Sequence, residues 1–179
     1  MRILFWVPYP PEGASNRYRV EQYLPYLHNV KIQYSLHPFW SSAAFKVLYK
    51  EGFYLKKFYF FILGTISRVL DLLLIYKYDS VFIHREAYPI GLTFFETILS
   101  ILSKPIIYDF DDAIFLPSSS RQNIFIDRFK NPSKIKKIIR MSNCIIAGNQ
   151  YLADFALKDN KEVSVIPTAI DTEKYAPVH

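Results

Sequence analysis

The feature that most constrains the fold is an alternation, along the whole chain, of short apolar runs with longer segments of helical spacing. The first run, Arg2–Val7, is densely apolar and ends at Pro8, which is typical of a central strand buried on both faces. Apolar residues then recur at positions 20, 23, 24 and 27, one face of a helix. Parallel strands need long crossovers, and helices supply them, so the alternation predicts an α/β chain with a Rossmann-like parallel sheet flanked by helices.

The same reasoning places the other elements. Further strands are expected at Val30–Leu36, Val81–Ile83, Pro105–Tyr108, Cys144–Ala147 and Val163–Ile166. Helices are expected within 41–77 with breaks at Gly52 and Gly64, over Gly91–Leu102, around 135–139, and over 150–158 with Asn149 as cap. Residues Leu116–Asn131, with a proline and three consecutive serines, are expected to form a mobile loop.

Length and charge narrow the function classes. The 179 residues suit one domain, and the net charge of +6 favours anionic partners. The chain has no zinc-ligand spacing, basic heptad region or RNP-type aromatic motif, so we expect no nucleic acid as partner. Lipid headgroups or phosphorylated small molecules fit the charge better.

Cysteine content and hydropathy bear on the compartment. Cys144 is the single cysteine, which excludes an internal disulfide, and its apolar run predicts burial as a small hydrophobe. We expect neither a signal peptide nor a transmembrane helix, because charged residues interrupt the apolar region Phe53–Ile75 well short of the ~20 residues that span a bilayer. A cytoplasmic location is therefore expected.

Polar residues gather where a parallel sheet binds its ligands, outside the carboxyl ends of the strands. This rule selects five segments: Tyr9–Arg19, His84–Glu86, Asp109–Asp112, Gly148–Asn149 and Thr168–Asp171. In the first, Gly13 would let backbone approach a ligand, and Arg17 and Arg19 are suited to phosphate, unless both are solvated surface residues.

The other two polar clusters each leave alternatives open. His84, Arg85 and Glu86 form either a local salt-bridge cluster or one wall of a polar substrate pocket. Asp109, Asp111 and Asp112 repel one another, so their proximity is costly unless cations, donors or protonation relieve it. Strand geometry places Asp109 and Asp111 on one face and Asp112 on the other.

This run of aspartates has three possible interpretations. It could cap the following residues or bind Arg85. It also resembles the DxD nucleophile strand of haloacid-dehalogenase phosphatases, although that motif normally opens the first strand of its domain. A metal-binding DxD of GT-A transferases is a weak match because the sheet pattern differs, and we expect no metal site.

Taken together, the segments resemble the N-terminal domain of glycosyltransferase family 4 and its relatives in the GT-B fold. The resemblance is carried by MRILFWVP, RYRVEQYLPYL, HREAYP, PIIYDFDD, NCIIAGNQYLADFAL and VSVIPTAIDTEKYAP, and it runs essentially from Met1 to Pro177. The chain departs from the family at Thr168-Ala169, where relatives have Asn-Gly, and at Gly13, where relatives commonly have two glycines.

The resemblance implies a retaining glycosyltransferase that moves a sugar from a nucleotide-sugar to a glycan or lipid-linked acceptor, without metal or other cofactor. It implies a Rossmann-like domain over 1–175, with 176–179 opening a linker to a C-terminal donor-binding domain, and hence an inactive isolated chain. Asp111 would contact the donor sugar as the catalytic residue, and Gly13, Arg17 and Arg19 would face the donor phosphates. The acceptor side would comprise His84, Arg85, Glu86, Asp109 and Asp112. A stand-alone α/β binding or regulatory module is the non-enzyme alternative.

The segment 41–77 raises one further possibility. Aromatic residues crowd it together with Lys46, Lys50, Lys56 and Lys57, which suits an interface with an anionic membrane surface. The chain would then be peripheral on the inner face of the cell membrane. Alternatively, the rings pack on the sheet and the lysines are solvated.

Overall fold

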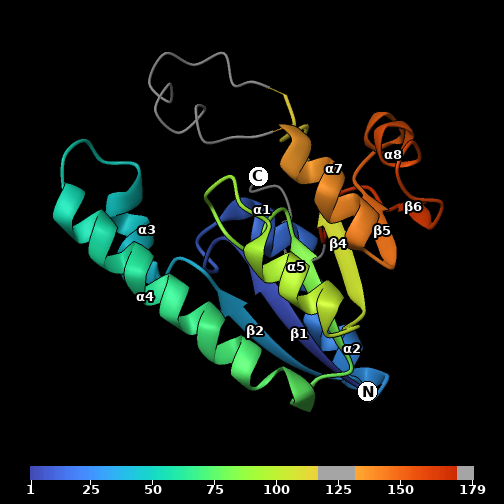
Figure 1. Ribbon diagram of the computed structural model, residues 1–179, viewed down its shortest axis with the longest axis horizontal. Helices are drawn as coiled ribbons and strands as arrows, with labels where there is room; N and C mark the ends of the chain where they lie inside the picture. Colours follow the sequence, from blue (N-terminus) through green and yellow to red (C-terminus); the bar gives the residue numbers. More distant parts are fainter. Residues whose placement is uncertain (117–131, 173–179) are drawn as a thin grey trace.

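The computed structural model describes residues 1–116 and 132–172 and contains a six-stranded, all-parallel sheet in the order β2-β1-β3-β4-β5-β6 (Figure 1). The strands are β1 (Arg2–Val7), β2 (Gln33–Pro38), β3 (Ser80–His84), β4 (Ile106–Phe110), β5 (Cys144–Ala147) and β6 (Val163–Val165). The helices are α1 (Ala14–Arg19), η1 (Glu21–Tyr23), α2 (Leu24–Asn29), α3 (Ser42–Leu48), α4 (Tyr54–Leu73), η2 (Ile75–Lys77), α5 (Phe94–Ile101), α7 (Pro132–Met141) and α8 (Gln150–Ala156). The predicted α/β class with a Rossmann-like parallel sheet is confirmed.

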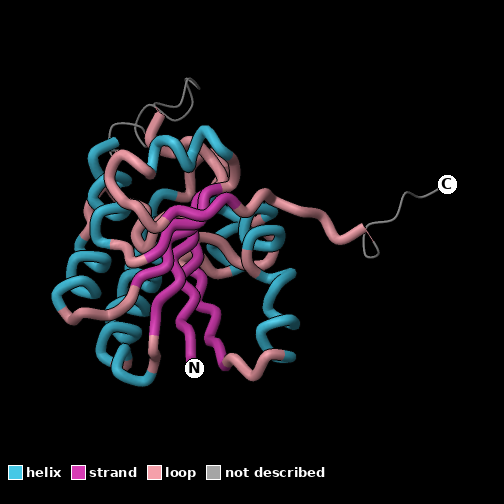
Figure 2. Tube along the Cα trace, turned by 90° about the vertical axis from the view of Figure 1, so that its right-hand side faces the viewer, coloured by secondary structure: helices cyan, strands magenta, loops and turns pink. Residues whose placement is uncertain are grey.

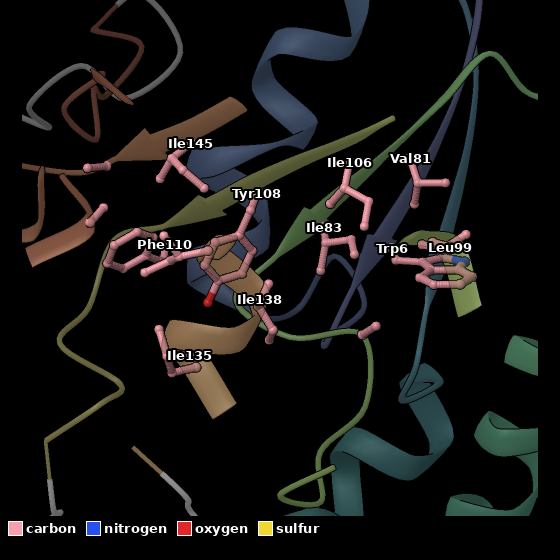
Figure 3. Close-up of a cluster of buried hydrophobic side chains, with 14 of the residues drawn as sticks. Trp6, Val81, Ile83, Leu99, Ile106, Tyr108, Phe110, Ile135, Ile138 and Ile145 are labelled. Atoms are coloured by element: carbon pink, nitrogen blue, oxygen red, sulfur yellow. The ribbon is translucent and has the colours of Figure 1, made fainter. Parts of the chain in front are cut away.

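The sheet lies between two layers of helices (Figure 2). Because successive side chains of a strand point to opposite faces, each strand feeds two cores. On one face, Trp6, Ile83 and Tyr108 pack against apolar residues of α5 and α7 (Figure 3). On the other face, Ile3, Phe5 and Val7 pack against the residues Val20 and Leu24 of the segment that joins β1 to β2.

Several element boundaries differ from the sequence expectation. Gly52 does separate α3 from α4, with φ +73°, but Gly64 does not break a helix. Gly64 lies inside α4, where the helix packs closely on Phe39. A Cβ at this position would lie 2.7 Å from the carbonyl oxygen of Phe39, so only glycine fits there. The helix expected around 20–27 is divided into α1, η1 and α2, and β2 begins at Gln33 because α2 and a turn at Lys31 (φ 58°) occupy the preceding residues.

Cys144 is half-buried rather than buried. Ile145 and Ala147 take the core-facing positions of β5, so Cys144 points to the opposite face. Most of the expected loop at Leu116–Asn131 and the linker at 176–179 lie outside the described residues. Within the described ranges, no helix is both long enough and apolar enough to cross a bilayer.

Candidate functional site

The candidate site lies at the carboxyl end of the sheet, where β1 is flanked by β2 on one side and β3 on the other. The chain leaves β1 toward β2 but later strands add beyond β3, so this is the topological switch point at which open α/β sheets bind ligands. Loops that follow β1, β3 and β4 meet there. Of the five segments expected at the carboxyl ends, the structure brings together side chains of the first three.

A chain of hydrogen-bonded side chains crosses the site. The imidazole Nδ1 of His84 lies 2.7 Å from Oδ2 of Asp109, its direct neighbour in the β3–β4 register. The Nε2 of His84 lies 2.8 Å from the hydroxyl of Ser15, which also donates to Oδ2 of Asp111 at 3.0 Å. A proton on Nδ1 satisfies Asp109, and the Ser15 hydroxyl then has two acceptors for one proton.

Arg19 holds Asp109, which is the buried end of this series of hydrogen-bonded side chains. Its guanidinium forms a two-pronged ion pair with Asp109, and both side chains are almost fully buried. Its third contact is the carbonyl oxygen of Ile166 at 2.5 Å, beyond β6. Arg19 was expected to face phosphate, but its donors are occupied by protein groups. Asp109 in turn is held as the partner of Arg19 and His84.

Asp111 is the carboxylate of the run that is left with free hydrogen-bonding capacity. Its Oδ1 is buried and has no hydrogen-bond partner in residues 1–116 and 132–172, although its Oδ2 accepts from Ser15. Gly148, after β5, permits this position of Asp111, because a Cβ at Gly148 would lie 2.9 Å from the Asp111 Cα. A buried carboxylate oxygen without a donor costs about 1–3 kcal/mol or more, which a hydroxyl group of a ligand would relieve.

Unsatisfied groups concentrate at this site. Five buried side-chain polar atoms in the described residues lack a hydrogen-bond partner, and three of them belong to Asn16, Arg17 and Asp111. Asn16 is fully buried, with its Nδ2 donating to Glu21 and its Oδ1 unpaired. Native structures leave few such atoms, so their clustering at the switch point indicates a binding site for a polar ligand.

Arg85 and Asp112 form the outer rim. Their side chains are joined at 2.9 Å, with Asp112 largely exposed, as the alternation of faces predicts. Arg85 has φ 64°, in the left-handed region that costs a non-glycine residue about 1–3 kcal/mol. The surroundings maintain this conformation: the Arg85 N–H donates to the Asp109 carbonyl at 2.7 Å, and Tyr108 donates its hydroxyl to the Arg85 carbonyl.

Glu86 points away from the hydrogen-bonded side chains of Ser15 and His84. It pairs at 2.8 Å with the buried Lys134 of α7, whose ammonium group also donates to the carbonyl oxygens of Tyr88 and Ile90. Lys134 thereby anchors the loop after β3 to α7. A small cavity beside this loop is lined by Glu86 and by rings and prolines, among them Tyr9, Trp40 and Pro89. Burial, with a further contribution from a hydrogen bond to Tyr49, raises the pKa of the Tyr9 hydroxyl.

The two remaining residues of the first loop do not join the chain of side chains. Gly13 is buried within the loop itself, where a Cβ would lie 2.7 Å from that of Tyr9. Arg17 lies with its guanidinium carbon 5.4 Å from the ring centre of Tyr18.

Sequence reasoning missed four residues of this region: Ser15, Asn16, Lys134 and Gly148 as the neighbour of Asp111. Ser15 and Asn16 lie inside the selected segment Tyr9–Arg19, but nothing in their spacing distinguishes them from ordinary loop residues. Lys134 stands among several exposed lysines of α7, and only the packing reveals that it is buried.

The geometry also bears on the competing readings of the aspartates. A phosphatase nucleophile at Asp109 would need an open carboxylate, whereas Asp109 is 1% exposed and paired with Arg19 and His84. In residues 1–116 and 132–172, no three histidine, cysteine or acidic side chains converge as metal ligands would. A large open depression between Arg2, His28 and Lys31 lies at the β2 edge and shares no residue with the site.

Comparison with known proteins identifies no family or function for this chain. No family model and no curated protein matches the chain. Six chains of solved structures match it, among them one described as "Crystal structure of conserved protein from Enterococcus faecalis V583". That chain is 12% identical, with 97% of this chain and 93% of that chain covered and a TM-score of 0.32, a value that carries no argument about function.

Proposed function

We propose that this chain is the acceptor-side, N-terminal half of a retaining glycosyltransferase that moves a sugar from a nucleotide-sugar to a glycan or lipid-linked acceptor. The observation that carries the proposal is the unpaired, buried Oδ1 of Asp111 at the switch point of a parallel sheet. A sugar hydroxyl is the donor that this oxygen lacks. The resemblance of the sequence to glycosyltransferase family 4 supports the same assignment.

In this proposal each residue has a separate role. Asp111 accepts a hydrogen bond from a hydroxyl of the transferred sugar and stabilises positive charge that develops at its ring, so Asp111 is the catalytic residue. Ser15 and His84 hold the other oxygen of Asp111, and Asp109 with Arg19 holds His84. Gly13, Arg17 and the loop between them lie toward the donor, and Arg85, Glu86 and Asp112 lie toward the acceptor. The nucleotide-sugar is a co-substrate, and no resident cofactor is part of the proposal.

The test is Asp111→Asn in the complete enzyme, with Asp154→Asn on α8 as matched control. Removing one preorganised electrostatic contact costs about 2.7–4 kcal/mol, so kcat should fall about 10²–10³-fold for Asp111→Asn. Asp154 is an exposed carboxylate that accepts a hydrogen bond from Gln150 within α8, away from the site, so its variant should retain most activity. Unchanged turnover in Asp111→Asn, with the fold verified by circular dichroism, would remove Asp111 from the mechanism.

A second candidate function rests on a different feature of the same site. The hydroxyl of Ser15, the imidazole of His84 and the carboxylate of Asp109 are spaced as nucleophile, base and orienting group are in acyl-transfer enzymes. The carboxylate of Asp111, 3.0 Å from the hydroxyl, opposes negative charge on Ser15 and makes this candidate the weaker one. Covalent labelling of Ser15 by a fluorophosphonate, absent in Ser15→Ala, would favour the hydrolase. A binding or regulatory module would show neither labelling nor sugar transfer.

We also propose a place of action, peripheral on the inner face of the cell membrane. A transferase with a lipid-linked acceptor works where that acceptor lies, and the net charge of +6 favours an anionic surface.

A further inference from the structure

Helix α4 packs Phe60, Phe61 and Leu72 on the core, yet it also buries two charged residues and leaves a long apolar row exposed. Its buried positions include Gly64, Arg68 and Asp71. Its outer face carries a row of large apolar side chains in alternating steps of four and three residues, each 39–87% exposed: Leu55, Tyr59, Ile62, Ile66, Val69 and Leu73. We call this row and the neighbouring Phe58, Leu63 and Leu70 the outer face of α4. Between residues 58 and 73 the only charged side chains are Arg68 and Asp71, and both are buried.

The polar inner side explains why the apolar side points outward. Arg68 donates to the carbonyl oxygens of Val7, His37 and Ala87 at 3.0–3.1 Å, and Asp71 accepts from the indole of Trp6 at 2.8 Å. These bonds fix the rotation of α4 about its own axis. The outer face therefore cannot turn toward the sheet without breaking them.

An exposed apolar surface of this length indicates a binding partner. Twenty residues of helix extend about 30 Å, and the outer face runs along most of that length. Apolar patches on soluble monomers rarely exceed a few hundred Å², and larger ones mark interaction surfaces. Figure 1 shows α4 along the flank of the molecule, with α3 beside its first turns.

The N-terminal end of α4 identifies the chemistry of the occupant. Lys56 lies 5.5 Å from the ring centre of Phe53, and the rings of Phe53 and Tyr54 are 47% and 79% exposed. Lys57 lies on the opposite side of the helix, and its ammonium group donates to the carbonyl oxygen of Lys50. Amphipathic rings beside ammonium groups suit the headgroup level of a bilayer, with phosphate as counterion. A second copy would bring the exposed Glu51 or Asp79 near Lys56, so it is the rival that the oligomeric state must exclude.

We propose that the outer face of α4 docks on an anionic lipid bilayer, with its aliphatic side chains at the acyl boundary and Lys56 at the phosphates. The same helix is tied through Arg68 to Val7 and Ala87, which border the two loops that carry Ser15 and Arg85. Docking thereby holds the candidate site at a fixed orientation to the membrane, so the acceptor is a lipid-linked one. The choice of acceptor rests on the proposed glycosyl transfer, whereas the docking does not.

Vesicle flotation of the purified 179-residue chain tests the docking directly. The chain should float with vesicles of phosphatidylcholine and phosphatidylglycerol at low salt, and less with phosphatidylcholine alone or at high salt. Ile66→Glu should lower recovery at least tenfold. Its matched control is Leu157→Glu at the end of α8, because both side chains are 49% exposed, and this control should float like the wild type. Lys56→Gln should lower binding to the anionic vesicles about fivefold, since one lysine near an anionic surface adds roughly a factor of five.

The outcomes separate this proposal from its rivals. Absence of flotation on anionic vesicles at low salt would overturn it, provided that circular dichroism shows a folded chain. A dimer in light scattering that Ile66→Glu dissociates, with no flotation, would assign the outer face to a second copy. Transfer to a soluble acceptor by the complete enzyme, unaffected by vesicles, would leave the docking standing but exclude the lipid-linked acceptor. If the chain floats with vesicles but the complete enzyme transfers sugar to no acceptor, the result would contradict the proposed function and leave the docking proposal standing.

Discussion

Replacement of Arg68 by alanine probes the buried network that orients α4. Arg68 is fully buried, donates to three backbone carbonyl oxygens, and lies 5.1 Å from the ring centre of Trp6. Burial lowers the pKa of its guanidinium from 12.5 to about 10, against the opposing effect of Asp71, so the group stays charged at neutral pH. Its removal takes a donor from three buried carbonyl oxygens, of which that of Val7 keeps the N–H of Phe39, and takes the guanidinium partner from Asp71.

The expected loss follows from these contacts. Breaking a buried ion pair by removing one partner costs about 3–5 kcal/mol, and Asp71 retains Trp6 and His37 as partners, which holds the loss within that range. Domains of this kind are stable by about 5–15 kcal/mol, so Arg68→Ala should lose a large fraction of the free energy of unfolding.

Urea unfolding followed by circular dichroism measures the effect. Arg140→Ala is the matched control, because Arg140 also pairs with an aspartate, Asp159, but its side chain is 62% exposed. That variant should stay within about 1 kcal/mol of the wild type. A loss below about 1 kcal/mol for Arg68→Ala, or equal losses in the two variants, would refute the assignment of Arg68 as the residue that fixes α4.

Two further predictions concern single residues. Burial raises the pKa of Glu96 despite the opposing charge of Lys134, so the folded chain favours the protonated acid, and this stabilisation is lost as pH rises through the raised pKa. Glu96→Gln should therefore raise the urea midpoint at about pH 8 and have less effect near pH 4; an equal shift at both pH values would contradict the sign. Gly148→Ala should cost about 1–3 kcal/mol in thermal unfolding and displace Asp111, because the new Cβ meets the Asp111 backbone; a Tm equal to that of the wild type would show that this contact is not tight.

Hydrophobic patterning was sufficient to predict the class of fold and the site's general position. Dense apolar runs such as Arg2–Val7 can be buried only as central strands, and the helical segments between them make the sheet parallel. The carboxyl ends of such strands meet at one edge, so the loops with His84, Asp109 and Asp111 could be placed together from the sequence. The alternation of side chains along a strand likewise predicted that Asp112 would point away from the other two aspartates.

Partnerships over long sequence distances were decided by the tertiary structure. Which carboxylate Arg19 neutralises depends on the register of β4 against the helix after β1, and no local pattern encodes a contact across 90 residues. That pairing leaves Asp111, rather than Asp109, with an unpaired oxygen. Gly64 and Arg68 are further examples. From sequence alone, a glycine predicts a break in a helix and an arginine predicts an exposed side chain, whereas the packing buries both residues within α4. The sequence by itself determined the strands and the edge of the sheet at which the candidate site lies. Only the packing determined that α4 buries Arg68 and Asp71 and leaves a row of apolar side chains exposed, because buried charged groups need hydrogen-bond partners and these fix how the helix is rotated.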